Sequence, residues 1–209
     1  MRLEFFPYPF LFGLVILFFL ILFFRLAKRS WSYLVFFSAF WVYLLLMVGL
    51  IIFPIPFKAP LEINEIWPSF QSALPRIYLI PHNYSNLGLY PFYYNFEILA
   101  NILLTIPFGF FLLLVWPWFS NKMLLVALAV GLFNEGAQFL LLVLWGFSYR
   151  VVDINDVFLN AAGVLIGFVF YKIFIWILRT IVKLFRIQPK GFLKFMVESG
   201  LKEKRSSTP

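Results

Sequence analysis

Long runs of apolar residues alternate with short polar stretches along the chain. Five runs reach the ~20 residues that a helix needs to cross the hydrocarbon core of a bilayer, and they cover Phe5–Phe24, Trp31–Phe53, Ile98–Phe119, Met123–Trp145 and Val157–Leu178. Because lipid cannot satisfy exposed backbone polar groups, such segments must be helical. The pattern therefore predicts an all-α, polytopic transmembrane bundle of five helices. Pro107 lies inside the third run and predicts a kink or a local break there.

Composition excludes a soluble domain. Of the 209 residues, 63% are hydrophobic and only 12% are charged. A soluble domain of this size has too much surface for its volume to hide that apolar area. The chain contains no cysteine, which excludes disulfides, thiol catalysis and thiolate metal sites.

Basic residues predict the orientation in the membrane. The link between the first two runs contains Arg25, Lys28 and Arg29 and no acidic residue, and short loops rich in Lys and Arg remain in the cytoplasm. This places the N-terminus outside and the C-terminus in the cytoplasm. The tail there carries eight more basic residues, which are Arg179, Lys183, Arg186, Lys190, Lys194, Lys202, Lys204 and Arg205.

The net charge of +8 lies mostly beside apolar segments. It therefore indicates a bilayer with anionic headgroups at the basic tail as the partner, and no nucleic acid. Apolar residues recur at helical spacing within this tail. It is either an amphipathic helix along the inner membrane surface or a partly disordered basic segment.

The chain divides into four regions. Two N-terminal transmembrane helices (1–53) precede an extracytoplasmic loop (54–97), a three-helix core (98–178) and a basic cytoplasmic tail (179–209). The loop contains seven prolines, from Pro54 to Pro91, and several aromatic residues. This composition is unlike that of a flexible polar linker, so we expect a cap folded against the outer ends of the helices.

Polar residues inside the apolar runs mark a candidate site. An ionisable residue within a membrane helix costs at least ~2.5 kcal/mol on insertion scales, so it usually faces the protein interior and has a partner. The fourth run contains Asn134, Glu135 and Gln138, and the third contributes Asn101 with Thr105 one turn deeper. These side chains predict a polar contact between the two helices.

A second polar stripe begins the fifth run. If this helix starts near Asp153, then Asp156 and Asn160 follow at i+3 and i+7 and share its face. We expect an outward-facing pocket lined by Asn101, Glu135, Gln138, Arg150, Asp153, Asp156 and Asn160. The structural alternative is that the acidic residues cap the helix or pair with Arg150, while the carboxamides bridge helices.

Glycines predict the packing below this pocket. Gly163 and Gly167 form a GxxxG spacing, which lets two helix backbones approach closely. Ala127 and Gly131 repeat the four-residue spacing on the fourth run. The simplest assembly packs the fourth and fifth helices against each other through these small residues.

Three blocks of the chain resemble the VanZ-like family of bacterial membrane proteins, over roughly 51–172. The blocks are Asn101-Ile-Leu-Leu-Thr-Ile-Pro107-Phe-Gly109, then Asn134-Glu135-Gly-Ala-Gln138, then a run of spaced residues at Arg150, Asp153, Asp156, Asn160, Gly163 and Gly167. Gly131 departs from the family pattern, since many members have Ser there. The resemblance implies a multi-pass protein of the bacterial plasma membrane. The founding member is associated with resistance to the glycopeptide teicoplanin.

Two functions are compatible with these residues. We favour a non-enzymatic cell-envelope protein that binds a lipid-linked wall precursor or a lipophilic glycopeptide, needs no cofactor or metal, and contributes to teicoplanin resistance. The alternative is a membrane-embedded enzyme acting on a lipid-linked substrate. In that enzyme Glu135 is the general base, and Asp153 and Asp156 act as acid or hold a divalent cation. A third interpretation leaves the polar residues as bridges between helices only.

Overall fold

The computed structural model describes residues 7–52, 70–71, 74–81, 91–145 and 152–206. Five of its helices are long and apolar enough to cross a membrane, and they are α1 (Pro7–Leu26), α2 (Trp31–Ile52), α4 (Pro91–Val115), α5 (Met123–Trp145) and α6 (Ile154–Leu184). The smaller elements are η1 (Leu74–Arg76), η3 (Pro117–Lys122), β1 (Ile77–Tyr78), β2 (Val152–Asp153) and the tail helix α7 (Gly191–Ser206). The all-α fold class and the five apolar helices are confirmed, and the chain is a multi-pass membrane protein.

Two helices of the core are longer than their apolar runs. α4 begins at Pro91 and not at Ile98, and α6 continues to Leu184 and not to Leu178. The 31 residues of α6 span ~46 Å at ~1.5 Å per residue, whereas the hydrocarbon core of a bilayer is ~30 Å thick. Hydropathy marks only the part of a helix that lipid covers, so it misses these polar ends.

α4 continues through Pro107 without a break, so of the two expectations for the third run, a kink or a local break, the break is wrong. A proline leaves the carbonyl four residues before it without its usual N–H donor and distorts the turn. That carbonyl belongs to Leu103. The hydroxyl of Tyr43 on α2 donates a hydrogen bond to the next carbonyl, that of Leu104, at 2.5 Å, so a neighbouring helix contacts the backbone of the turn that contains the proline.

α4 and α6 form the most closely packed pair in the bundle. A side chain at Gly163 would meet the carbonyl of Ile102, and one at Gly167 would meet the carbonyl of Ile106. From the other side, a side chain at Gly109 would meet the carbonyl of Val164. The two backbones can touch only because these positions carry no side chain.

The expected packing partner of the GxxxG face is therefore wrong. Gly163 and Gly167 face α4, not α5, whereas Gly131 of α5 lies against the backbone of Val157, nearer the start of α6. The physical reason lies on α4, where Thr105 and Gly109 form a second stripe of small residues at the same spacing. α6 thus packs on two helices. It contacts α4 through Gly163 and Gly167, and it contacts α5 near its own N-terminus, at Val157.

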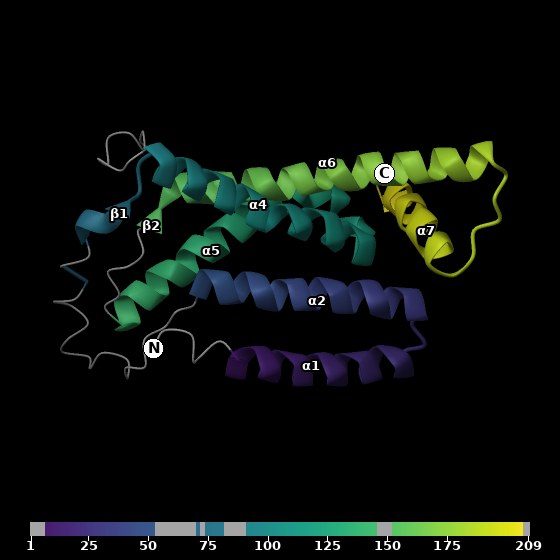
Figure 1. Cartoon of the computed structure of the whole chain (residues 1–209), viewed down its shortest axis with the longest axis horizontal. Helices are drawn as coiled ribbons and strands as arrows, with labels where there is room; N and C mark the ends of the chain where they lie inside the picture. The colour runs from purple at the N-terminus through teal and green to yellow at the C-terminus, as the bar shows by residue number, and fades with distance from the viewer. Residues whose placement is uncertain (1–6, 53–69, 72–73, 82–90, 146–151, 207–209) are drawn as a thin grey trace.

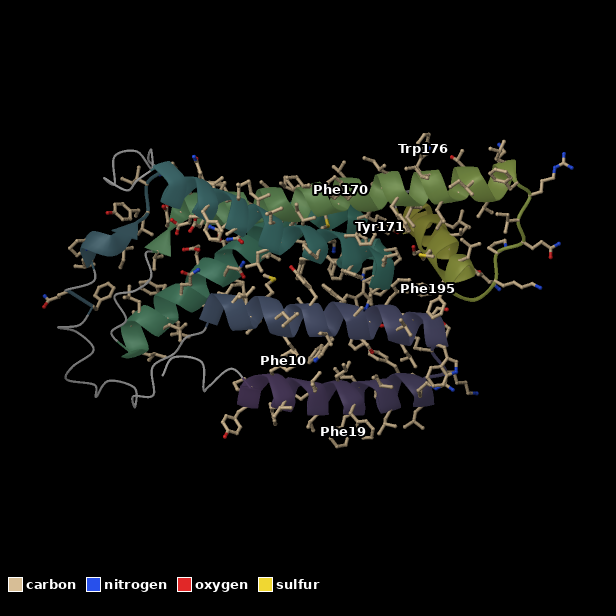
Figure 2. All side chains as sticks on the ribbon, in the orientation of Figure 1. Phe10, Phe19, Phe170, Tyr171, Trp176 and Phe195 are labelled. Carbon is tan, nitrogen blue, oxygen red and sulfur yellow. The ribbon has the colours of Figure 1, made fainter. Side chains whose placement is uncertain are left out.

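Lipid-facing and buried side chains separate clearly around the bundle. In Figure 2, Phe19, Phe170 and Trp176 point away from the helices, whereas Tyr171 points into the bundle. α1 lies at the periphery beside α2 (Figure 1), and most of its large side chains are exposed. Exposure of so large an apolar surface to water would be unfavourable, so these exposed side chains support burial of the helices in lipid.

The turn after α1 and the turn after α6 lie at the same end of the molecule (Figure 1), which we call the basic end. The turn after α1 contains Lys28 in the left-handed conformation, with φ of 57°, and the amide of Arg29 donates to the carbonyl of Phe24. Arg186, with φ of 50°, occupies the matching position after α6. Both turns are Schellman motifs, and both bring positive charge to the basic end.

α7 folds back against the basic end and does not extend away from it (Figure 1). Its Phe192 and Phe195 pack on Phe36 of α2, and the hydroxyl of Ser199 lies 3.2 Å from that of Tyr171 on α6. The helical interpretation of the tail is therefore confirmed for these residues. One face of this helix contacts protein.

Candidate functional site

The polar residues of the core gather at the opposite end of the bundle, where β2 leads into α6. We call this the polar end (Figure 1). Asp153 has extended backbone angles, and its carboxylate accepts a hydrogen bond at 2.8 Å from the amide of Asn155. It is therefore the N-cap of α6, where an acidic side chain also interacts favourably with the helix dipole. This geometry matches the structural alternative for Asp153.

Glu135 of α5 is buried beside this cap. One carboxylate oxygen accepts the backbone N–H of Asp153 at 3.0 Å. The other lies 3.4 Å from the side-chain nitrogen of Gln138, one turn further along α5. Glu135 therefore ties α5 to the first turn of α6.

Asn160 connects all three helices of the core. Its side-chain oxygen accepts from the amide nitrogen of Asn134 on α5 at 3.2 Å, and its own amide nitrogen donates to the carbonyl of Asp156 at 2.8 Å. The hydroxyl of Thr105 on α4 lies 2.8 Å from the carbonyl of Asn160. Asn160 is only 2% exposed, so these protein groups replace water around it.

One atom in this network lacks a partner. The side-chain oxygen of Asn134 makes no hydrogen bond to the described residues, although Asn134 is only 1% exposed. Leaving a buried acceptor unpaired costs about 1–3 kcal/mol, and such an atom needs an explanation. An acceptor held in place by its own amide group, which is bound to Asn160, is suited to receive a donor from a bound molecule.

A cavity of about 480 Å³ lies beside Asn134, among α2, α4, α5 and α6. Its polar wall is formed by four carboxamides, which are Asn101, Asn134, Gln138 and Asn160. Its apolar wall consists of Leu50, Ile51, Phe96, Ala100, Leu103 and Leu104.

The cavity opens sideways toward lipid. Leu50 on α2 is 64% exposed and Leu103 on α4 is 61% exposed, and both line it. Because these side chains lie on apolar membrane-spanning helices, the surface that they share faces hydrocarbon. A molecule in the bilayer can therefore reach the carboxamides without crossing water.

The structure divides the predicted site residues into two groups. Asn101, Gln138 and Asn160 line the lateral cavity. Glu135, Asp153 and Asp156 are buried at the start of α6 and do not line it. Arg150 lies outside the described residues.

Two residues outside the predicted ligand set belong to this site. Asn134 lines the cavity and Thr105 bonds to Asn160. The sequence carried a signal for both, since Asn134 shares a helix face with Gln138 and Thr105 lies one turn from Asn101.

The described residues contain no group of three or more acidic or histidine side chains placed to hold a metal ion. Two of the three candidate catalytic acids accept backbone hydrogen bonds, Glu135 from Asp153 and Asp153 from Asn155. These bonds give both carboxylates a positional role in holding α5 and the start of α6.

Parts of the proline-rich loop are anchored beside this site. Ile77 and Tyr78 of β1 pair in parallel with Val152 and Asp153 of β2, and the ring of Phe70 meets that of Phe139 on α5 edge to face. The described part of the loop therefore lies against the polar end. Most of the loop, with its expected role as a cap, falls outside the described residues.

The sequence model of a protein family described as VanZ/LLP1 matches residues 40–176, which is about two thirds of the chain. The match includes all three blocks of the resemblance, and it also covers the last part of α2. Neither a curated protein nor a solved structure matches the chain.

Proposed function

This chain belongs to the VanZ/LLP1 family, and we propose that it binds a membrane amphiphile in the lateral cavity at the polar end. The observation that carries the proposal is that Asn134, whose side-chain oxygen is buried without a partner among the described residues, lines a cavity open to lipid. An amphiphile supplies both an apolar chain for the leucine wall and a hydrogen-bond donor for Asn134. The protein in this proposal is a non-enzymatic component of the bacterial cell envelope.

The chemistry of the wall narrows the ligand class. The four polar groups are neutral carboxamides, each with a carbonyl acceptor and an NH₂ donor. Hydroxyl and amide groups are their natural partners, and a sugar or a peptide carries both. A cavity of about 480 Å³ falls within the ~300–1,000 Å³ usual for ligand sites, so it holds one sugar or a length of acyl chain and not a whole glycopeptide.

Two molecules of this class occur at the bacterial membrane. One is the polyprenyl-linked disaccharide peptide from which the cell wall is built, and the other is a glycopeptide with an acyl chain, such as teicoplanin. Binding of either supports a contribution to teicoplanin resistance, as the family resemblance implies. That step rests on analogy with the family and not on the site itself.

Binding of the polyprenyl-linked disaccharide peptide to the purified chain in detergent tests the proposal. Asn134→Leu removes the unpaired acceptor, and we expect it to weaken binding about fivefold, since one hydrogen bond contributes ~1 kcal/mol. Asn101→Leu on the cavity wall is a second variant, in case Asn134→Leu does not fold. Asn121→Leu makes the same change in exposed η3 and should bind like the wild type.

The same titration with teicoplanin, and with a glycopeptide lacking the acyl chain, separates the two ligand types. If Asn134→Leu and Asn101→Leu both fold and bind every one of these molecules as tightly as the wild type, the cavity is not the binding site and the proposal fails.

A further inference from the structure

A second cavity lies at the basic end, between α6 and the returning α7. Its volume is about 610 Å³, larger than that of the lateral cavity. It exists because α7 folds back close to α6, where Gly200 packs on the side chain of Ile175. A hydrogen bond between the hydroxyls of Tyr171 and Ser199 holds the two helices together beside this cavity.

Three basic residues of α6 line this cavity. Lys172, Arg179 and Lys183 follow one another at i, i+7 and i+11, so they share one face of the helix. None of the described residues that line the cavity is acidic. A smaller cavity at the same end, lined by Lys28 and Arg29, includes Glu198, so its positive charge is partly balanced by protein.

The cavity lies where α6 leaves the membrane. Counting ~1.5 Å per residue from Ile154, the helix has crossed the ~30 Å hydrocarbon core at about residue 174. Lys172 lies at this boundary, and Arg179 and Lys183 lie beyond it. Negatively charged lipid headgroups occupy this depth, and basic pockets between helices bind them.

Apolar side chains beside the charges favour a lipid over a free anion. Trp176 stands on the same face as Lys172 and Arg179, is 68% exposed, and points away from the bundle (Figure 2). Leu201 of α7 lines the cavity and is also exposed. An indole at the membrane interface contacts both the headgroup and the first part of an acyl chain.

We infer that the cleft between α6 and α7 is a binding site for the phosphate headgroup of an anionic phospholipid. Arg179 and Lys183 contact the phosphate, while Trp176 and Leu201 contact the acyl chains. This inference is independent of the amphiphile proposed for the lateral cavity, which lies at the opposite end of the bundle. The bound lipid would also join α7 to α6 and so stabilise the fold of the tail.

The test measures binding of phosphatidylglycerol to the purified chain in detergent by native mass spectrometry, with phosphatidylcholine of the same acyl chains and inorganic phosphate as parallel probes. The double variant Arg179→Gln/Lys183→Gln should bind phosphatidylglycerol about thirtyfold more weakly, because each of the two basic groups near the headgroup contributes ~1 kcal/mol. Arg179→Lys/Lys183→Arg keeps the charges and should restore binding.

The matched control is Arg186→Gln/Lys190→Gln, which removes the same charge from the turn between α6 and α7 without touching the cavity. It should retain the wild-type affinity. An equal loss in this control would show a diffuse effect of charge and overturn the inference. So would a bound population of inorganic phosphate or phosphatidylcholine equal to that of phosphatidylglycerol.

Discussion

Among single residues, Asn160 joins the core of the bundle. It bonds to α5 through Asn134 and to α4 through Thr105, and it closes its own turn through the carbonyl of Asp156. A carboxamide presents a donor and an acceptor side by side, so the hydrophobic residues that surround the network cannot replace it. In this arrangement the side-chain oxygen of Asn134 has no hydrogen-bond partner among the described residues.

Asn160→Leu should lower the free energy of unfolding by about 2–4 kcal/mol, because it leaves the amide of Asn134 buried without a partner. The double variant Asn134→Leu/Asn160→Leu should be more stable than this single variant, since removal of both partners leaves no buried group unpaired. Thermal unfolding of the two variants in the same detergent provides the comparison. A double variant that loses the sum of the two single losses would show that the pair is not coupled.

The sequence identified most residues of this network, but not how they divide between the start of α6 and the cavity wall. The cost of burying Glu135 and Gln138 in a membrane helix was enough to place them in the interior, and the i, i+3, i+7 spacing placed Asp153, Asp156 and Asn160 on one face. Spacing along a helix does not say which side chain reaches across to another helix. For this reason the sequence grouped the acidic residues with the carboxamides, whereas the structure separates the helix start from the cavity wall.

At the level of the elements, contact between α4 and α6 depends on positions without side chains. Gly109, Gly163 and Gly167 each face a backbone carbonyl of the opposite helix. The same contact brings Thr105 to Asn160 and holds α4 as one wall of the lateral cavity. The glycines therefore support the site as well as the fold.

Gly163→Ala and Gly167→Ala should each destabilise the bundle by about 1–3 kcal/mol, because the added methyl group forces the backbones apart. Gly136→Ala on α5 is the matched control, since nothing lies within 4 Å of its Cβ position. It should be neutral or slightly stabilising, because alanine favours helix more than glycine does. Unfolding temperatures in detergent report all three, and a loss at Gly136→Ala equal to the others would contradict the packing described.

The sequence predicted correctly that Gly163 and Gly167 pack against another helix, but the predicted partner was α5 and the observed partner is α4. A GxxxG spacing identifies a surface for close approach and carries no information about the partner. Thr105 and Gly109 on α4 have the same four-residue spacing as Ala127 and Gly131 on α5, and all four are residue types found at membrane helix interfaces, so spacing alone does not choose between the two helices. The two-residue ladder of β1 and β2 was also missed, since a strand so short has no periodicity to detect.

On the scale of the whole molecule, the two ends of the bundle differ in character. The polar end carries the carboxamides, the helix cap and the anchored part of the loop. The basic end carries both positively charged turns and α7 (Figure 1). Hydropathy and the positions of Lys and Arg predicted the five helices and the shared location of the basic segments, because both follow from the composition of continuous stretches. That the basic end faces the cytoplasm stays a prediction.

The lateral cavity arises only when four helices come together, so most of its polar residues could be predicted from the sequence and its shape could not. α2 shows how this happens, because it contributes Leu50 and Ile51 to the wall while its sequence carries hardly any polar residue near the membrane centre. A helix without any candidate site residue in its sequence therefore lines the opening of the cavity toward lipid.

The central claim is that this cavity receives an amphiphile, and filling it tests that claim most directly. Ala100→Trp places an indole in the cavity from α4 and leaves the carboxamides in place, whereas Ala129→Trp makes the same change on an exposed face of α5 that does not line it. Titration of both purified variants with the polyprenyl-linked disaccharide peptide is the measurement. Ala100→Trp should bind at least about tenfold more weakly than the wild type while Ala129→Trp binds normally. Equal, wild-type binding by a folded Ala100→Trp variant would contradict the claim.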